Sequence, residues 1–119
     1  MNEIGLAALL DQIRVAATDA CAFVEGMSKD DFLADKRTQN AVIMSLMVIG
    51  EAAKKINDRF PEFVADRGEI PWLNIRGMRN RIAHGYFDIN LETVWVTVQR
   101  SLPDLLANLP SQSRGEDPG

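Results

Sequence analysis

The sequence predicts an all-α protein, folded as an antiparallel up-and-down helical bundle of four main helices and one short helix. Apolar residues recur at spacings of three and four along most of the chain, which is the period of an α-helix. No segment shows the alternation of a β-strand, and no internal repeat is present. Because 119 residues suffice for one hydrophobic core, we expect a single domain over residues 1–109.

The first predicted helix carries one apolar stripe and ends near Gly26. That stripe consists of Leu6, Leu10, Ile13, Ala17, Ala20 and Val24. A short second helix follows and extends to Leu33. Its start is indicated by Ser28, a favourable N-cap, and by Asp30 and Asp31, whose charge suits a first helical turn.

The third predicted helix begins at Asp35 or Thr38. Over residues 41–56 its apolar face is too broad for a surface helix, so we expect it at the centre of the bundle, in contact with several neighbours. Pro61 is expected to end this helix. A looser segment should then lead to Gly68.

Two more helices complete the predicted bundle. The fourth is expected from about Leu73 to His84, where Gly85 ends it. The fifth starts after the N-cap residue Asn90, and Pro103 should bend or shorten its last turns. Its apolar stripe consists of Leu91, Val94, Val98, Leu102 and Leu105.

Composition sets further bounds. Cys21 is the single cysteine, so neither an internal disulfide nor a zinc cluster is expected. The longest uncharged run, residues 38–50, is shorter than the roughly 20 residues of a membrane span, and no cationic leader opens the chain. We therefore expect a cytoplasmic protein with no membrane contact, ending in a disordered polar tail over residues 110–119.

The most distinctive segment is residues 79–86, which contain the only histidine and the only tyrosine of the chain. The surrounding window, Pro71–Phe87, carries Arg76, Arg79 and Arg81 and no acidic residue, although the formal net charge of the protein is -4. A local cationic site on an acidic protein indicates phosphate binding in preference to a generally basic surface.

The residue types in this segment suit phosphate chemistry without a metal ion. His84 can move protons near neutral pH, Arg79 can stabilise a phosphate, Asn80 can support them, and Arg76 and Arg81 are further candidates for phosphate contacts. The arginine and the histidine five residues later lie about 140° apart on a straight helix. Either the helix is distorted there, or two copies of the motif meet. A symmetric dimer would also supply a second histidine, so that one could act as base and one as acid in RNA cleavage.

Structural readings of the same residues stay open. His84 and its neighbouring arginines suit the end of a helix, where cations interact favourably with the helix dipole. Tyr86 alone is typical of a packing residue with a solvated hydroxyl. The spacing of Glu51 favours an intrahelical ion pair with Lys54 or Lys55 over a catalytic role.

The pattern Arg-Asn-x-x-x-His-x-Tyr over residues 79–86 resembles the signature of HEPN-domain proteins, and specifically of the HepT-like ribonuclease toxins. The resemblance extends over roughly Ile4–Leu109, in the order usual for that family. Its further phrases lie at residues 35–42, 49–54, 70–72, 77–78, 86–88 and 102–103.

This resemblance implies a HEPN-type bundle that forms a homodimer and cuts RNA, not DNA, in a cleft where the two motifs meet, with no metal or cofactor. Carried over to this sequence, Arg79 and His84 would be catalytic and Asn80 would support them. The family is typically the toxin of a type VII toxin–antitoxin pair. A nucleotidyltransferase antitoxin would silence it by transferring AMP to Tyr86, because a bulky anion there blocks the cleft and repels RNA.

Two other functions compete with this interpretation. The protein could be a noncatalytic, nucleotide-binding interaction subunit of a nucleotidyltransferase complex. Alternatively, it could be a structural dimer in which His84 and the arginines only cap a helix. RNA cleavage that depends on His84 would separate the ribonuclease from both.

Overall fold

The computed structural model describes residues 4–110, which are largely helical with no β-strand among them. The prediction of an all-α protein is therefore confirmed. Pro110 is the one described residue of the predicted tail. Residues 111–119 lie outside the described part, so the disordered tail stays a prediction.

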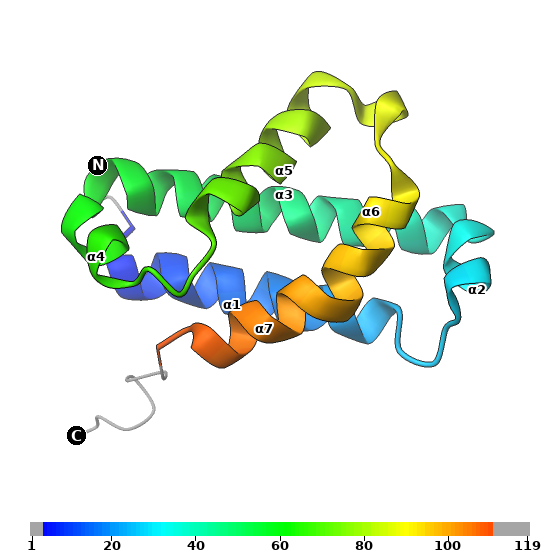
Figure 1. Cartoon of the computed structure of the whole chain (residues 1–119), viewed down its shortest axis with the longest axis horizontal. Helices are drawn as coiled ribbons and strands as arrows, with labels where there is room; N and C mark the ends of the chain where they lie inside the picture. The colour runs from blue at the N-terminus through cyan, green and yellow to red at the C-terminus, as the bar shows by residue number, and fades with distance from the viewer. Residues whose placement is uncertain (1–3, 111–119) are drawn as a thin grey trace.

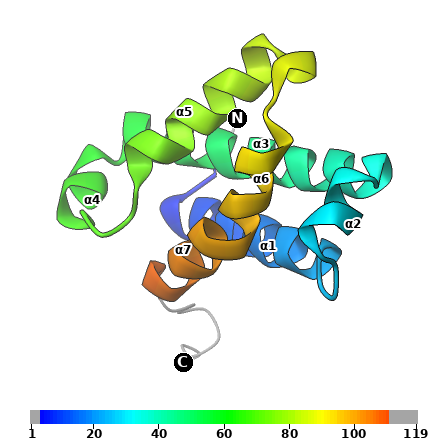
Figure 2. The same ribbon diagram turned by 45° about the vertical axis from the view of Figure 1, so that its right-hand side comes forward.

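The helices follow one another with short connections. They are α1 (Leu6–Phe23), α2 (Lys29–Leu33), α3 (Lys36–Arg59), α4 (Pro61–Asp66), α5 (Trp72–His84), the 3₁₀ turn η1 (Tyr86–Asp88), α6 (Leu91–Val96), the π-helical segment η2 (Thr97–Ser101) and α7 (Leu102–Asn108). Figure 1 shows α1 and α3 running in opposite directions along the long axis, and α5 rising away from α3 towards η1. The chain then returns through α6 to α7, which packs on α1 (Figures 1 and 2).

Side-chain caps begin three of the helices as expected. Ser28 and Asp31 form a capping box at α2, with both hydrogen bonds at 3.0 Å. Asp35, not Thr38, is the N-cap of α3, and hydrogen bonds from Thr38 hold the pKa of its carboxyl below the ordinary value. At α6, the Asn90 side chain accepts hydrogen bonds from the backbone N–H groups of the second and third helical residues.

The segment after α3 is more regular than expected. Pro61 occupies the first turn of α4, where its missing N–H has no helical partner to lose and its φ already suits a helix. The expected loose segment is therefore partly helical. Phe63 of this short helix makes an edge-to-face contact with Trp72, and the Trp72 indole donates a hydrogen bond to the carbonyl of Arg67.

Pro103 disturbs its helix, although the helix continues to Asn108. A proline ring cannot donate the intrahelical hydrogen bond and crowds the carbonyl four residues earlier, here that of Gln99. The residues before it, Thr97–Ser101, form a π-helical turn, which holds more residues than an α-helical turn. The disturbance thus lies before the proline, and the expected shortening of the last turns does not occur.

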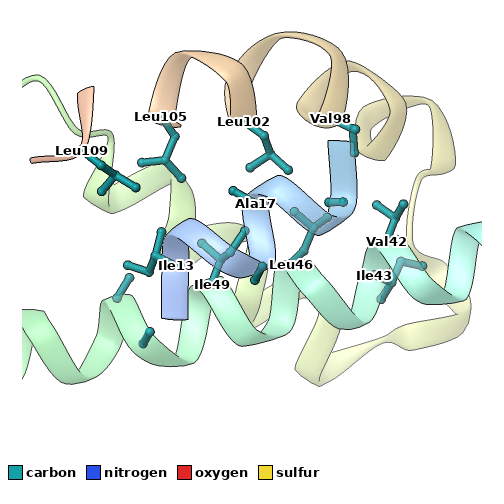
Figure 3. Close-up of a cluster of buried hydrophobic side chains, with 14 of the residues drawn as sticks. Ile13, Ala17, Val42, Ile43, Leu46, Ile49, Val98, Leu102, Leu105 and Leu109 are labelled. Carbon is teal, nitrogen blue, oxygen red and sulfur yellow. The ribbon is translucent and has the colours of Figure 1, made fainter. Parts of the chain in front are cut away.

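The hydrophobic core is shared by α1, α3 and the α6–α7 helix (Figure 3). Its members include Ile13, Ala17, Val42, Ile43, Leu46, Ile49, Val98, Leu102, Leu105 and Leu109. The broad apolar face of α3 therefore has the central position that its pattern predicts. In contrast, α5 buries only Trp72 and Ile82, and it packs chiefly against α3.

Candidate functional site

The motif residues lie at the outer end of α5 and in the turn that follows it. Arg79, Asn80 and His84 belong to the last two turns of α5, and Tyr86 begins η1. Gly85 ends α5 as expected, but with extended backbone (φ -154°) and not in the left-handed conformation usual for a glycine cap. Its N–H bonds to the carbonyl of residue 81, and its own carbonyl accepts the N–H of residue 88, which starts the 3₁₀ turn.

A close contact with α3 fixes the position of Arg79. The point where a Cβ of Gly50 would stand is only 2.3 Å from Arg79 Cβ and 2.6 Å from its Cγ. Any larger residue at this position would collide with the arginine, because ordinary contacts of a Cβ begin near 3.4 Å. Because Gly50 has no side chain, α5 can lie against α3 at Arg79, the candidate catalytic arginine.

The Arg79 guanidinium is bound by an acidic residue of α3. Its Nε and Nη2 both donate to Glu51 Oε2, at 2.7 and 2.6 Å, while Nη1 donates to Asn80 Oδ1 at 3.2 Å. The expected pairing of Glu51 with Lys54 or Lys55 is wrong, since the nearby intrahelical pair is Lys54–Asp58. Two neighbours thus orient Arg79, which is about one quarter exposed.

The histidine lies on another side of the same helix. His84 is exposed and lines a hollow of about 400 Å³, together with Arg81 and Asp88. Neither Arg79 nor Glu51 lines this hollow. One chain therefore keeps its catalytic arginine and histidine candidates on different sides of α5, as their five-residue spacing predicts.

Tyr86 extends the motif towards the beginning of α3. Its hydroxyl donates a hydrogen bond to Asn40 Oδ1, and 40% of the residue remains exposed. Phe87 packs edge-to-face against the Tyr86 ring and is 91% exposed. An apolar residue this exposed, directly beside the motif, is suited to contact with another molecule.

The three arginines of the motif region differ in charge balance. Glu51 compensates Arg79, whereas Arg76 and Arg81 are exposed and have no hydrogen bond or ion pair with any residue of 4–110. The unpaired arginine charge of α5 therefore comes from Arg76 and Arg81. This arrangement can attract a phosphate and can present one fixed guanidinium to it.

Other surfaces carry less of this chemistry. A hollow of about 610 Å³ lies between α1 and α3, where Val15, Phe23, Met44 and Val48 are exposed, but neither histidine nor arginine lines it. Within residues 4–110, no three metal-binding side chains cluster together. No helix in this part of the chain is both long and apolar enough to cross a membrane.

Three residues shape the site although the sequence analysis predicted no contact between them and the motif, namely Asn40, Gly50 and Glu51. Each lies on α3, at least 28 residues from its partner on α5 or η1, so helical periodicity contains no signal for these contacts. A glycine inside an otherwise apolar helix was the one visible sign, because such a residue often marks a close approach of two backbones.

Comparison with known proteins agrees with this description. A family model described as ribonuclease HepT-like matches residues 13–111. The protein named "Probable ribonuclease HepT" of Thermococcus cleftensis is 40% identical over 83 residues, which cover 70% of this chain and 73% of the relative. No solved structure matches the chain significantly.

Two relatives from Methanocaldococcus jannaschii also match. "Putative RNase MJ0127" is 40% identical over 86 residues, or 72% of this chain and 69% of the relative. "Putative RNase MJ1380" is 31% identical over 105 residues, or 88% of this chain and 94% of the relative. Together with the family match, these similarities show that the chain belongs to the ribonuclease HepT-like family.

Proposed function

We propose that this protein is the toxin of a type VII toxin–antitoxin pair, a cytoplasmic, metal-independent endoribonuclease whose active site forms between two copies of the chain. The observation that carries this proposal is the placement of the motif. Arg79 is held by Glu51 and Asn80, while His84 and Tyr86 are exposed on other parts of the same helix end, in a chain of the ribonuclease HepT-like family.

The proposed reaction needs no group beyond the protein and the RNA. The 2'-hydroxyl loses its proton to a base and attacks the adjacent phosphorus, the bond to the 5'-oxygen breaks, and that oxygen takes a proton from an acid. The products are a 2',3'-cyclic phosphate and a 5'-hydroxyl. Two His84 side chains, one per subunit, are candidates for base and acid, while Arg79 stabilises the charge that builds on the phosphate.

A dimer is part of the proposal because one chain has one histidine, which lies away from Arg79. Phe87 offers an apolar surface next to the motif for the second copy. We expect Phe87→Glu to lower the mass seen by light scattering from dimer to monomer and to abolish cleavage. A stable monomer of the unmodified protein that still cuts RNA would contradict the shared site.

RNA cleavage tests the enzymatic part of the proposal. The unmodified protein should cut single-stranded RNA in the presence of EDTA, and His84→Ala should remove that activity while leaving the fold intact by circular dichroism. Mixing Arg79→Ala subunits with His84→Ala subunits should restore part of the cleavage activity if the two chains contribute different groups. Activity that depends on a metal, or that survives in His84→Ala, would overturn this mechanism.

Control by an antitoxin is tested through Tyr86. Coexpression with a nucleotidyltransferase should add the mass of AMP to the wild type and not to Tyr86→Phe, which should still cut RNA. Bound AMP would bring negative charge beside His84 and oppose the approach of RNA. If neither added mass nor cleavage is observed, the noncatalytic interaction subunit becomes the better description.

A further inference from the structure

A groove with apolar and polar walls runs between α5 and the helix formed by α6, η2 and α7. It consists of two adjoining hollows, of about 250 and 400 Å³, and Met78, Arg81 and Thr93 line both. Figure 1 shows the two helices that border it as separate arms joined by η1. His84 lines the outer hollow, so the groove begins at the proposed active site.

The inner hollow combines an apolar floor with neutral polar groups. The floor comes from the core residues Leu46, Ile49, Leu102 and Leu105, and the polar groups belong to Asn74, Thr93, Thr97 and Ser101. The Thr97 hydroxyl donates a hydrogen bond to the carbonyl oxygen of Thr93, with 2.8 Å between the two oxygens. The Thr97 oxygen can therefore still accept a hydrogen bond from a ligand. Such a lining suits a flat, mostly apolar group with hydrogen-bonding edges.

The outer hollow carries the charge. Arg81, which has no partner among the described residues, stands between the two hollows, and His84, Asp88 and Asn90 lie further out. A ligand that spans the groove would therefore meet apolar carbon at one end and a free guanidinium at the other. Nucleotides have this division, since an aromatic base is joined through ribose to an anionic phosphate.

The π-helical segment gives the groove its polar wall. Thr93, Thr97 and Ser101 recur every four residues and all line the inner hollow. Residues four apart lie on the same face of a helix, so these three side chains line one side of the hollow. Thr97 and Ser101 are the two ends of the π-helical segment before Pro103, which therefore borders the groove.

We propose that this groove binds one nucleotide of the RNA next to the bond that is cut, with its base in the inner hollow and its phosphate on Arg81. The inference rests on the ribonuclease function proposed above and adds a source of base preference to it. The inner hollow, at about 250 Å³, suits a single base and is too small for a helix of a partner protein, which is about 10 Å across.

The test compares two tryptophan substitutions on η2. Ser101→Trp fills the inner hollow, whereas Gln99→Trp adds the same ring to an exposed residue that does not line it. Both are made in a His84→Ala background, and binding of a short labelled single-stranded RNA is followed by fluorescence anisotropy. We expect Ser101→Trp to raise Kd about tenfold, the loss of roughly one base contact, and Gln99→Trp to leave it unchanged.

A second readout uses active protein with the wild-type histidine. Cleavage sites in an RNA pool of random sequence should show a base preference beside the cut, and Thr97→Val, which removes a hydroxyl and keeps the side-chain shape, should alter that preference. Unchanged binding in Ser101→Trp and unchanged preference in Thr97→Val would overturn the groove while leaving the nuclease intact. RNA binding that Ser101→Trp weakens, without cleavage by the wild type, would support the groove and contradict the nuclease.

Discussion

Two arginines that stand two residues apart on α5 have opposite surroundings. Arg79 is held by Glu51 and Asn80 against the glycine of α3, whereas Arg81 has no partner in the described part of the chain and lines an open groove. A fixed guanidinium can stabilise the charge that develops on a phosphate without reorganising, and a free guanidinium can adjust its position to a flexible RNA. Arginines that form one cationic cluster in the sequence are therefore suited to different roles.

The largest effect is expected from a substitution that forces α5 away from α3 and so displaces the held Arg79. Gly50→Ala would place a Cβ 2.3 Å from Arg79 Cβ, so the helix must shift by about 1 Å. We expect a loss of about 1–3 kcal/mol in the free energy of unfolding, the usual cost of overpacking. RNA cleavage should fall about 100-fold, because a displacement of that size separates catalytic groups from their target. Denaturant unfolding and a cleavage assay measure the two effects.

Gly77→Ala is the matched control, because this glycine belongs to α5 but its added Cβ would meet only Arg81 Nη2, at 3.8 Å. Replacing a helical glycine with alanine without a collision should stabilise the protein by about 0.5–1 kcal/mol. Equal damage from the two substitutions would show that the close approach at Gly50 is unimportant.

Removing the charge of Glu51 tests whether Arg79 must be held. In Glu51→Gln the guanidinium loses its ionic partner and gains freedom, so we expect kcat to fall about tenfold with KM nearly unchanged, since the arginine acts mainly on the transition state. Stability should change by only about 0.2–1 kcal/mol, because the pair is partly exposed.

Asp58→Asn is the corresponding control on α3, because it breaks the exposed Lys54–Asp58 pair without touching α5. Its stability cost should resemble that of Glu51→Gln, while cleavage should remain at the wild-type rate. A Glu51→Gln protein with unchanged kcat would mean that Asn80 and the packing at Gly50 suffice to orient Arg79.

A smaller effect is expected from the free arginines, and it should appear in the salt dependence. Arg81→Ala should reduce the slope of log Kd against log salt concentration for single-stranded RNA by about 0.7, the value for one lost phosphate contact. Arg76→Ala provides the comparison, because Arg76 is equally unpaired but lies outside the groove. Identical slopes for wild type and Arg81→Ala would remove this residue from the RNA path.

The smallest effect concerns the hydrogen bond between Tyr86 and Asn40 at the other end of the motif. Asn40→Ala should cost about 0.5–1 kcal/mol of stability, as for an ordinary partly exposed hydrogen bond, and should leave cleavage unchanged because Arg79 is held elsewhere. Thermal unfolding and the cleavage assay are sufficient. A large loss of activity would show that η1 and α3 together position the reactive groups.

Much of the fold could be predicted from the sequence because it depends on local rules. Apolar periodicity located the long helices, and the capping residues Ser28 and Asn90 located two helix starts. Phe60 and Pro61 end α3 as predicted, but the start of α4 at Pro61 was missed. Proline is allowed in the first turn of a helix as well as after the end of one, and local rules do not show whether a new helix follows.

The candidate site was predictable only in part. The sequence identified the segment that carries Arg79 and His84 and indicated that they diverge, because both conclusions follow from neighbouring residues. It could not identify Glu51 as a partner of Arg79, since the two residues are 28 positions apart and their contact depends on how α3 and α5 pack against each other. The comparisons establish the family, while the role of each site residue stays a prediction.

The limited packing of α5 has a consequence for motion. Only two of its residues are buried, whereas α1 and α3 share the central core, so opening of α5 exposes far less apolar surface than global unfolding does. We therefore expect amide hydrogens of residues 72–84 to exchange with solvent sooner than those of α1 and α3. The segment that bears the motif would then be a separate cooperative unit, able to detach and return while the rest of the bundle stays folded.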